Sequence, residues 1–86
     1  MVIVLDRVSE RHPELSKSDV EKAWDSAIAH MPRFDGRPFE YLAVGFDGNG
    51  RAIEMVGRRT DSGDWVIFHA FTPPTEKALR ELGLRR

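Results

Sequence analysis

The spacing of apolar residues changes once along this chain, and this change restricts the fold more than any other feature of the sequence. In the first part, apolar residues recur at intervals of three and four, as on one face of a helix: Val20, Ala23, Trp24, Ala27, Ile28 and Met31. From residue 41 the interval becomes two, as in a strand with one buried side: Leu42, Val44 and Phe46 alternate with Tyr41, Ala43 and Gly45. The pattern predicts helices followed by antiparallel strands.

The helix that carries the first pattern has a clear start signal. Ser16 precedes Asp19 by three residues, as in a capping box, and Leu15 and Val20 have the spacing of a hydrophobic staple. We expect this helix to continue until Pro32 stops it, because a proline inside a helix removes a hydrogen bond.

The regions on either side of this helix are less regular. Residues 3–12 have helical spacing and are expected to form a shorter helix that ends at Pro13; a strand at residues 2–5 is the competing prediction. Residues 32–39 contain two prolines and a glycine and are expected to form a loop.

Turn residues divide the second half of the chain into three strands and a helix. Asp-Gly-Asn-Gly at 47–50 is typical of a hairpin turn, and strands are expected from Arg51 to about Arg58 and from Trp65 to Phe71. Thr72 is expected to cap a last helix, which Gly83 ends. The predicted fold is one α+β domain over residues 1–86, a three-stranded antiparallel β-meander packed with helices, in the order α-α-β-β-β-α.

Pairing the strands across these turns predicts which residues share a face of the sheet. The expected pairs are Val44 with Ile53, Leu42 with Met55, Met55 with Phe68, and Ile53 with Ala70. One face, packed against Trp24, then holds Leu42, Val44, Ile53, Met55, Val66, Phe68 and Ala70. The opposite face holds Tyr41, Ala43, Glu54, Val56, Arg58, Trp65, Ile67 and His69.

The composition excludes several classes of protein. A net charge of −1 argues against a general nucleic-acid binder, whose affinity depends on neutralising phosphates. The chain has no cysteine, so disulfides and thiolate metal sites are excluded, and its three histidines lack the spacing of metal ligands. We therefore predict no metal and no cofactor. The apolar start, Met-Val-Ile-Val-Leu, is too short for a signal peptide or a membrane span, so we expect a cytoplasmic protein that does not enter a membrane.

The predicted pairing places His69 across from Glu54, and an imidazole and a carboxylate can both take part in proton transfer. The two residues are candidates for an acid–base pair; an ordinary cross-strand contact is the alternative. Arg58 stacked on Trp65 is a candidate phosphate-binding cation or a surface cation–π contact. Arg11 and His12, at the end of the first helix, either meet a substrate or favour the helix terminus electrostatically.

Three segments of the chain together resemble the BrnT-type toxins of bacterial toxin–antitoxin pairs, which belong to the RelE superfamily. The segments are RHPELSKSDVEKAW, YLAVGFDGNGRAIEMV and WVIFHAFTPPTEKAL, and the similarity covers most of residues 7–82. Arg11-His12 matches the family's basic residue followed by histidine, Gly45 to Arg51 its hairpin motif, and Phe68 to Ala70 part of its third-strand motif. The resemblance implies a ribonuclease that cleaves mRNA and is neutralised by a small antitoxin, often a ribbon-helix-helix DNA-binding protein.

The sequence departs from the family pattern in two places. Many members have an arginine shortly after the alanine of the third strand, where this chain has Phe71-Thr72-Pro73-Pro74, and the usual F-x-W-D opening is missing. Either the activity is lost or altered, as in a degenerate relative, or His69 and the arginines of the second strand replace the missing cation.

RNA cleavage by the 2′-hydroxyl requires a base, a cation on the phosphate and an acid for the leaving oxygen. In this chain Glu54 or His69 is the candidate base, Arg51 and Arg58 the phosphate clamp, and His12 the acid. The expected partners are RNA or the ribosome, the antitoxin, and a second copy in a homo-oligomer.

The alternative function is a non-catalytic protein-interaction module. It would use the second face of the sheet, where an apolar patch with a polar rim would bind a protein: Tyr41, Val56, Trp65 and Ile67.

Overall fold

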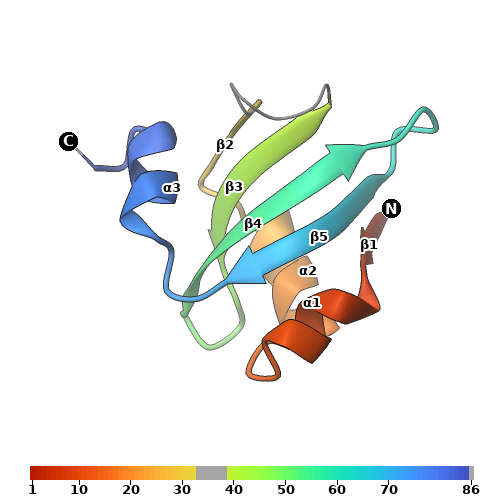
Figure 1. Ribbon diagram of the computed structural model, residues 1–86, viewed down its shortest axis with the longest axis horizontal. Coiled ribbons are helices and arrows are strands. Elements are labelled where there is room, and N and C mark those ends of the chain that lie inside the picture. Colours follow the sequence, from red (N-terminus) through yellow and green to blue (C-terminus); the bar gives the residue numbers. More distant parts are fainter. Residues whose placement is uncertain (33–38, 86) are drawn as a thin grey trace.

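The computed structural model describes residues 1–32 and 39–85, which form a small α+β domain with a five-stranded mixed sheet and three helices (Figure 1). The elements are β1 (Val2–Val4), α1 (Asp6–Arg11), α2 (Lys17–Asp25), β2 (Ala29–Pro32), β3 (Glu40–Phe46), β4 (Ala52–Arg59), β5 (Trp65–Phe71) and α3 (Glu76–Glu81). Across the sheet the strand order is β1-β5-β4-β3-β2; β1 is parallel to β5 and the other pairs are antiparallel. No helix in this described part is long and apolar enough to cross a membrane.

The predicted antiparallel meander is present as β3-β4-β5, but the sheet has an additional strand at each edge, so the predicted number of three strands and the order α-α-β-β-β-α are wrong. At one edge, Val2–Val4 pairs with β5 as a parallel strand, and α1 begins only at Asp6. The helix predicted at residues 3–12 and the strand predicted at residues 2–5 are thus each correct for part of this segment.

The additional strand at the other edge shortens the second helix. Helix α2 ends at Asp25, not at Pro32, and the Ser26 hydroxyl lies 2.9 Å from the carbonyl oxygens of both Lys22 and Phe46. The next residues, Ala29–Pro32, pair with β3. Their apolar spacing suits either structure, and pairing with an open sheet edge satisfies their backbone groups. Most of the loop predicted at residues 32–39 lies outside the described residues.

The start of α2 confirms the predicted capping box. The backbone N–H of Asp19 donates to the Ser16 hydroxyl at 3.1 Å, and the N–H of Ser16 donates to the Asp19 carboxylate at 3.1 Å. Leu15 and Val20, the predicted staple, are both fully buried in the same cluster. This local signal therefore orients α2 toward the core.

The turn between β3 and β4 holds one residue more than the predicted pairing assumed. The N–H of Gly50 donates to the Asp47 carbonyl at 3.2 Å, and the N–H of Asp47 donates to the Arg51 carbonyl at 3.1 Å. Gly50 has a φ of 81°, so the turn ends in a left-handed residue that glycine tolerates. The register consequently moves by one residue: Val44 pairs with Glu54, and Leu42 with Val56.

The turn between β4 and β5 has the same construction, and a bulge follows it. Gly63, with a φ of 85°, donates its N–H to the Thr60 carbonyl at 3.0 Å. The register then shifts between Val56 and Gly57, which leaves Phe68 without an opposite residue. The predicted pairs are again wrong, and the observed pairs are Met55 with Ala70, Val56 with His69, and Glu54 with Phe71.

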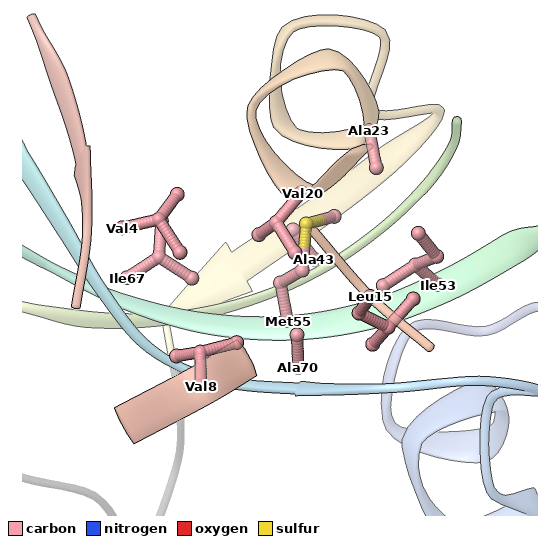
Figure 2. Close-up of a cluster of buried hydrophobic side chains, with 10 residues drawn as sticks. All are labelled: Val4, Val8, Leu15, Val20, Ala23, Ala43, Ile53, Met55, Ile67 and Ala70. Atoms are coloured by element: carbon pink, nitrogen blue, oxygen red, sulfur yellow. The ribbon is translucent and has the colours of Figure 1, made fainter. Parts of the chain in front are cut away.

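These register changes divide the predicted apolar set between the two faces of the sheet. The main core lies under α1 and α2 (Figure 2) and contains Val4, Val8, Leu15, Val20, Ala23, Ala43, Ile53, Met55, Ile67 and Ala70. A smaller cluster lies under α3 and contains Leu42, Val56 and Ala78, with Phe68 and Leu82 packed against it. The single buried face predicted from the sequence is therefore wrong, since β4 buries apolar side chains on both sides.

Two glycines allow α2 to lie close to the sheet. A Cβ on Gly45 would lie 1.8 Å from the carbonyl oxygen of Ala23, which is part of the helix backbone. A Cβ on Gly57 would lie 2.7 Å from Ile67 and 2.9 Å from the Trp24 ring. A Cβ at either position would force neighbouring atoms to move, at Gly45 the helix backbone itself, so these glycines allow the close packing of α2 on the sheet.

The last helix begins at a different residue from the one predicted. Thr75, not Thr72, caps α3, and its hydroxyl accepts from the N–H of Ala78 at 3.2 Å. The predicted end is confirmed: Gly83 has a φ of 73°, and the N–H of Leu84 donates to the Leu79 carbonyl at 2.8 Å. Because Ala78 belongs to the smaller cluster, α3 covers the face of the sheet opposite to α1 and α2.

Candidate active site

His69 and Glu54, which the sequence predicted to be neighbours, form a hydrogen bond. Nε2 of His69 lies 2.9 Å from Oε2 of Glu54, and the side chains are 40% and 9% exposed, respectively. The two residues are not directly opposite, as predicted, because His69 pairs with Val56. They are diagonal neighbours on the same face, which is close enough for long side chains to meet.

The Glu54 carboxylate also connects the sheet to α3. Its Oε1 accepts a hydrogen bond from the N–H of Thr75 at 2.7 Å. Burial raises the pKa of the Glu54 carboxyl, but the hydrogen bonds from His69 and Thr75 outweigh burial and hold this pKa below its ordinary value. Glu54 is therefore a buried, ionised carboxylate with a hydrogen bond to each of its oxygens.

This arrangement determines which ring nitrogen of His69 carries a proton. An ionised carboxylate can only accept hydrogen bonds, so Nε2 of His69 must donate to Glu54. In the neutral ring, Nδ1 then keeps its lone pair and can accept a proton from another molecule. The contact thus orients the imidazole as a base.

His69 and Glu54 line an open cavity of about 370 Å³ between α1, the sheet and α3. Its other lining residues are Arg7, Arg11, Leu42, Val56, Phe68, Thr75, Lys77, Ala78 and Glu81. None of the ion pairs within residues 1–32 and 39–85 involves Arg7, Arg11 or Lys77. Three cations are thus available to an anion that enters this cavity.

Arg58 and Trp65, predicted to stack on one another, lie on opposite faces of the sheet. Trp65 packs against Trp24, with ring centroids 5.1 Å apart, on the side of the main core. Arg58 lines a second cavity of about 250 Å³, which shares Arg7 and Phe68 with the first. Arg58 is therefore close to the candidate site, and Trp65 is remote from it.

Two other predicted residues do not line the cavity. The Arg51 guanidinium is engaged elsewhere: it donates to Asp47 at 2.7 Å, to the Glu14 carbonyl at 3.0 Å and to Asp19 at 3.3 Å. His12 contacts Glu14, with Nδ1 3.4 Å from Oε1, and Phe71, with ring centroids 5.2 Å apart. The structure thus brings together His69, Glu54 and Arg11, with Arg58 nearby.

Sequence reasoning missed Arg7 and Lys77. Arg7 lies four residues before Arg11, the spacing of neighbours on one helix face, so a correct start of α1 could have identified this pair. The Arg7 guanidinium also lies 5.9 Å from the centre of the Phe68 ring. Nothing in the sequence indicates that Lys77 joins them, because this depends on how α3 packs on the sheet.

The patch proposed for a protein-interaction module is not present on one face. Val56 and Ile67 are 5% and 0% exposed, and they belong to clusters on opposite sides of the sheet. Tyr41 and Trp65 pack against each other, with ring centroids 5.0 Å apart. These four residues therefore do not form the exposed binding patch that the alternative function predicted.

Comparisons of the chain with protein-family models, curated proteins and solved structures found no match. The resemblance to BrnT-type toxins therefore stays a prediction from the sequence. In the part of the chain that the structure describes, no group of three or more His, Asp or Glu side chains is placed to hold a metal ion.

Proposed function

We propose that this protein is a metal-independent ribonuclease, BrnT-like in kind, that cleaves RNA in the cavity around His69. The observation that carries the proposal is the His69 ring, held by the buried Glu54 carboxylate, in an open cavity with three cations that form no ion pair with the residues that the structure describes. Because no relative was found, the proposal depends on this geometry and on the resemblance of the sequence. The expected partners, an antitoxin and RNA or the ribosome, are part of the same proposal.

In this mechanism His69 accepts the proton of a ribose 2′-hydroxyl through Nδ1. The resulting oxygen attacks the neighbouring phosphorus, the bond from phosphorus to the 5′ oxygen breaks, and a 2′,3′-cyclic phosphate forms. Glu54 acts as a positioning residue, because it holds the ring and stabilises the imidazolium that develops.

The cavity also supplies the charges that this reaction needs. Arg7 and Arg11 can bind the phosphate and stabilise the negative charge that grows on its oxygens. The ammonium group of Lys77 lines the cavity and can protonate the leaving 5′ oxygen, a role that the sequence had suggested for His12. A substrate without a 2′-hydroxyl, such as DNA, cannot react in this way.

A cleavage assay with a matched substrate tests the proposal. The purified protein should cut an RNA oligonucleotide to a 2′,3′-cyclic phosphate in the presence of a chelator, and should not cut at a position where the ribose is 2′-deoxy. His69→Gln should lower the rate about 10²–10⁴-fold with little change in melting temperature, because His69 lies outside the main core and the glutamine amide can still donate a hydrogen bond to Glu54.

The control is His30→Gln, which changes an exposed histidine that does not line this cavity and should leave the rate unchanged. Equal cleavage by the wild type and His69→Gln, or cleavage at the deoxy position, would contradict the proposal.

A second candidate function, protein binding, is favoured by a different surface. A cavity of about 380 Å³ is lined mainly by apolar residues: Ile28, Val44, Phe46, Ala52, Pro73, Pro74, Leu79, Leu84 and Arg85. Ile28, Phe46 and Leu84 are 59%, 40% and 41% exposed, an arrangement typical of a surface that a partner covers. The absence of any RNA cleavage in the assay above would favour this function over the first.

A further inference from the structure

Both tryptophans of the chain line one cavity on the face of the sheet opposite to the candidate active site. This cavity has a volume of about 240 Å³, and its lining consists of Trp24, Asp25, Ala27, His30, Ala43 and Trp65. The centroids of the two indole rings lie 5.1 Å apart, and their planes meet at 54°. Tyr41, the only tyrosine of the chain, packs edge-on against Trp65, with ring centroids 5.0 Å apart. Both indole rings therefore border one opening, and the tyrosine ring packs beside them.

The core does not require this concentration of aromatic residues. Every fully buried apolar side chain in the described part of the chain is aliphatic or a methionine. Trp24 and Trp65 are only partly buried and pack at the margin of the main core. Each tryptophan therefore keeps part of its surface exposed beside the cavity.

The charges around the cavity select the sign of its ligand. Asp25 is exposed and forms no ion pair within residues 1–32 and 39–85, and no lysine or arginine of these residues lines the cavity. Asp25 is also the last residue of α2, where the helix dipole contributes further negative potential. Aromatic faces attract cations for the same electrostatic reason. All three contributions favour a positive ligand.

We propose that this cavity binds an organic ammonium group, carried either by a free small molecule such as choline or by a methylated lysine side chain. A single carboxylate beside aromatic walls suits a weakly hydrated alkylammonium better than a metal ion, which requires several oxygen or nitrogen ligands. This site is independent of the ribonuclease proposal and lies under a different helix.

Tryptophan fluorescence reports directly on this site, because the chain has no other tryptophan. Titration with choline should change the emission in a saturable way. The neutral isostere 3,3-dimethylbutan-1-ol has the same shape without the charge and should bind about 2- to 30-fold more weakly. Titration with N-acetyl-trimethyllysine amide identifies the source: tighter binding than choline indicates a methylated lysine, and weaker binding a free small molecule.

The variant Asp25→Asn separates binding from folding. It removes a negative charge from a helix C-terminus, where such a charge is unfavourable, so the melting temperature should not fall. Its affinity for choline should nevertheless fall by a similar factor of about 2 to 30. The matched control is Glu21→Gln, an exposed position of the same helix that does not line the cavity. Equal binding of choline and its neutral isostere, no saturable response, or unchanged affinity in Asp25→Asn would overturn the proposal.

Discussion

Glu54 takes part both in the packing of α3 on the sheet and in the candidate active site. Its carboxylate accepts hydrogen bonds from a strand residue, His69, and from the first backbone group of α3, Thr75. Because the side chain is only 9% exposed, loss of either donor would leave one oxygen of a buried carboxylate without a hydrogen bond. The same two contacts therefore hold α3 on the sheet and orient the candidate base.

The pKa of Glu54 predicts how stability changes with pH. Burial raises this pKa, but the hydrogen bonds from His69 and Thr75 lower it by more, so it lies below that of the unfolded chain. The contribution to the free energy of unfolding is therefore complete above the unfolded pKa and is lost as the pH falls through the folded pKa. In Glu54→Gln the melting temperature should be lower at neutral pH, and its difference from the wild type should shrink toward acid pH.

Thermal melts of the two proteins at a series of pH values measure this difference. The comparison isolates Glu54 from the other carboxyl groups with lowered pKa values, such as Asp47 and Asp64, because they are present in both proteins. A difference that stays constant with pH would show that the charge of Glu54 does not stabilise the fold.

Helix α2 packs very closely on strand β3. The helix backbone at Ala23 and the strand at Gly45 lie too near one another for a side chain between them. Local signals place the start of α2 through the Ser16 cap, but only the contact with β3 sets its depth on the sheet. The candidate ammonium cavity depends on this depth, since it lies between the end of α2 and the sheet.

Gly45→Ala should therefore be strongly destabilising. The added Cβ would lie 1.8 Å from a backbone oxygen, which cannot rotate away, so α2 must move and the free energy of unfolding should fall by about 1–3 kcal/mol or more. Gly48→Ala is the matched control, because its Cβ would meet only the flexible end of Lys22 at 3.5 Å. Chemical denaturation of both variants checks the prediction, which fails if the two lose similar stability.

For the molecule as a whole, Arg51 links parts of the chain that are distant in sequence. Its guanidinium contacts the β3–β4 turn at Asp47, the segment before α2 at Glu14, and the first turn of α2 at Asp19. The Asp47 side chain is fully buried, and Arg51 is its charged partner. Arg51 thus ties the hairpin to the helices, whereas Arg11 is exposed and lines the candidate active site.

The two arginines should consequently have opposite mutational effects. Arg51→Met should lower the melting temperature and leave the RNA cleavage rate of the folded protein unchanged, because Arg51 is remote from the cavity. Arg11→Met should leave the melting temperature unchanged and lower the cleavage rate on the order of 100-fold. Melting curves and rates measured on the same preparations distinguish them. A stable Arg51→Met protein with slow cleavage would restore the substrate-binding role suggested by the sequence.

Local sequence patterns predicted the features whose physics is local. The cap at Ser16, the glycine that ends α3 at Gly83, the two turns and the three long strands depend on contacts between near neighbours, and each lies close to where the pattern placed it. The contact between His69 and Glu54 was also predictable. The contact forms although the predicted register was wrong, because the observed register makes the two residues diagonal neighbours on one face.

Long-range contacts determined the rest. Each turn contains one residue more than its sequence suggested, and a one-residue change moves side chains to the other face of a sheet. The edge strands β1 and β2 form because the central strands offer unpaired backbone groups; the local pattern left a strand at residues 2–5 as one of two alternatives and gave no sign of β2. Arg7, Arg11 and Lys77 come from two helices far apart in the chain, so only the packing of α1 and α3 around β5 and β4 brings their charges to His69.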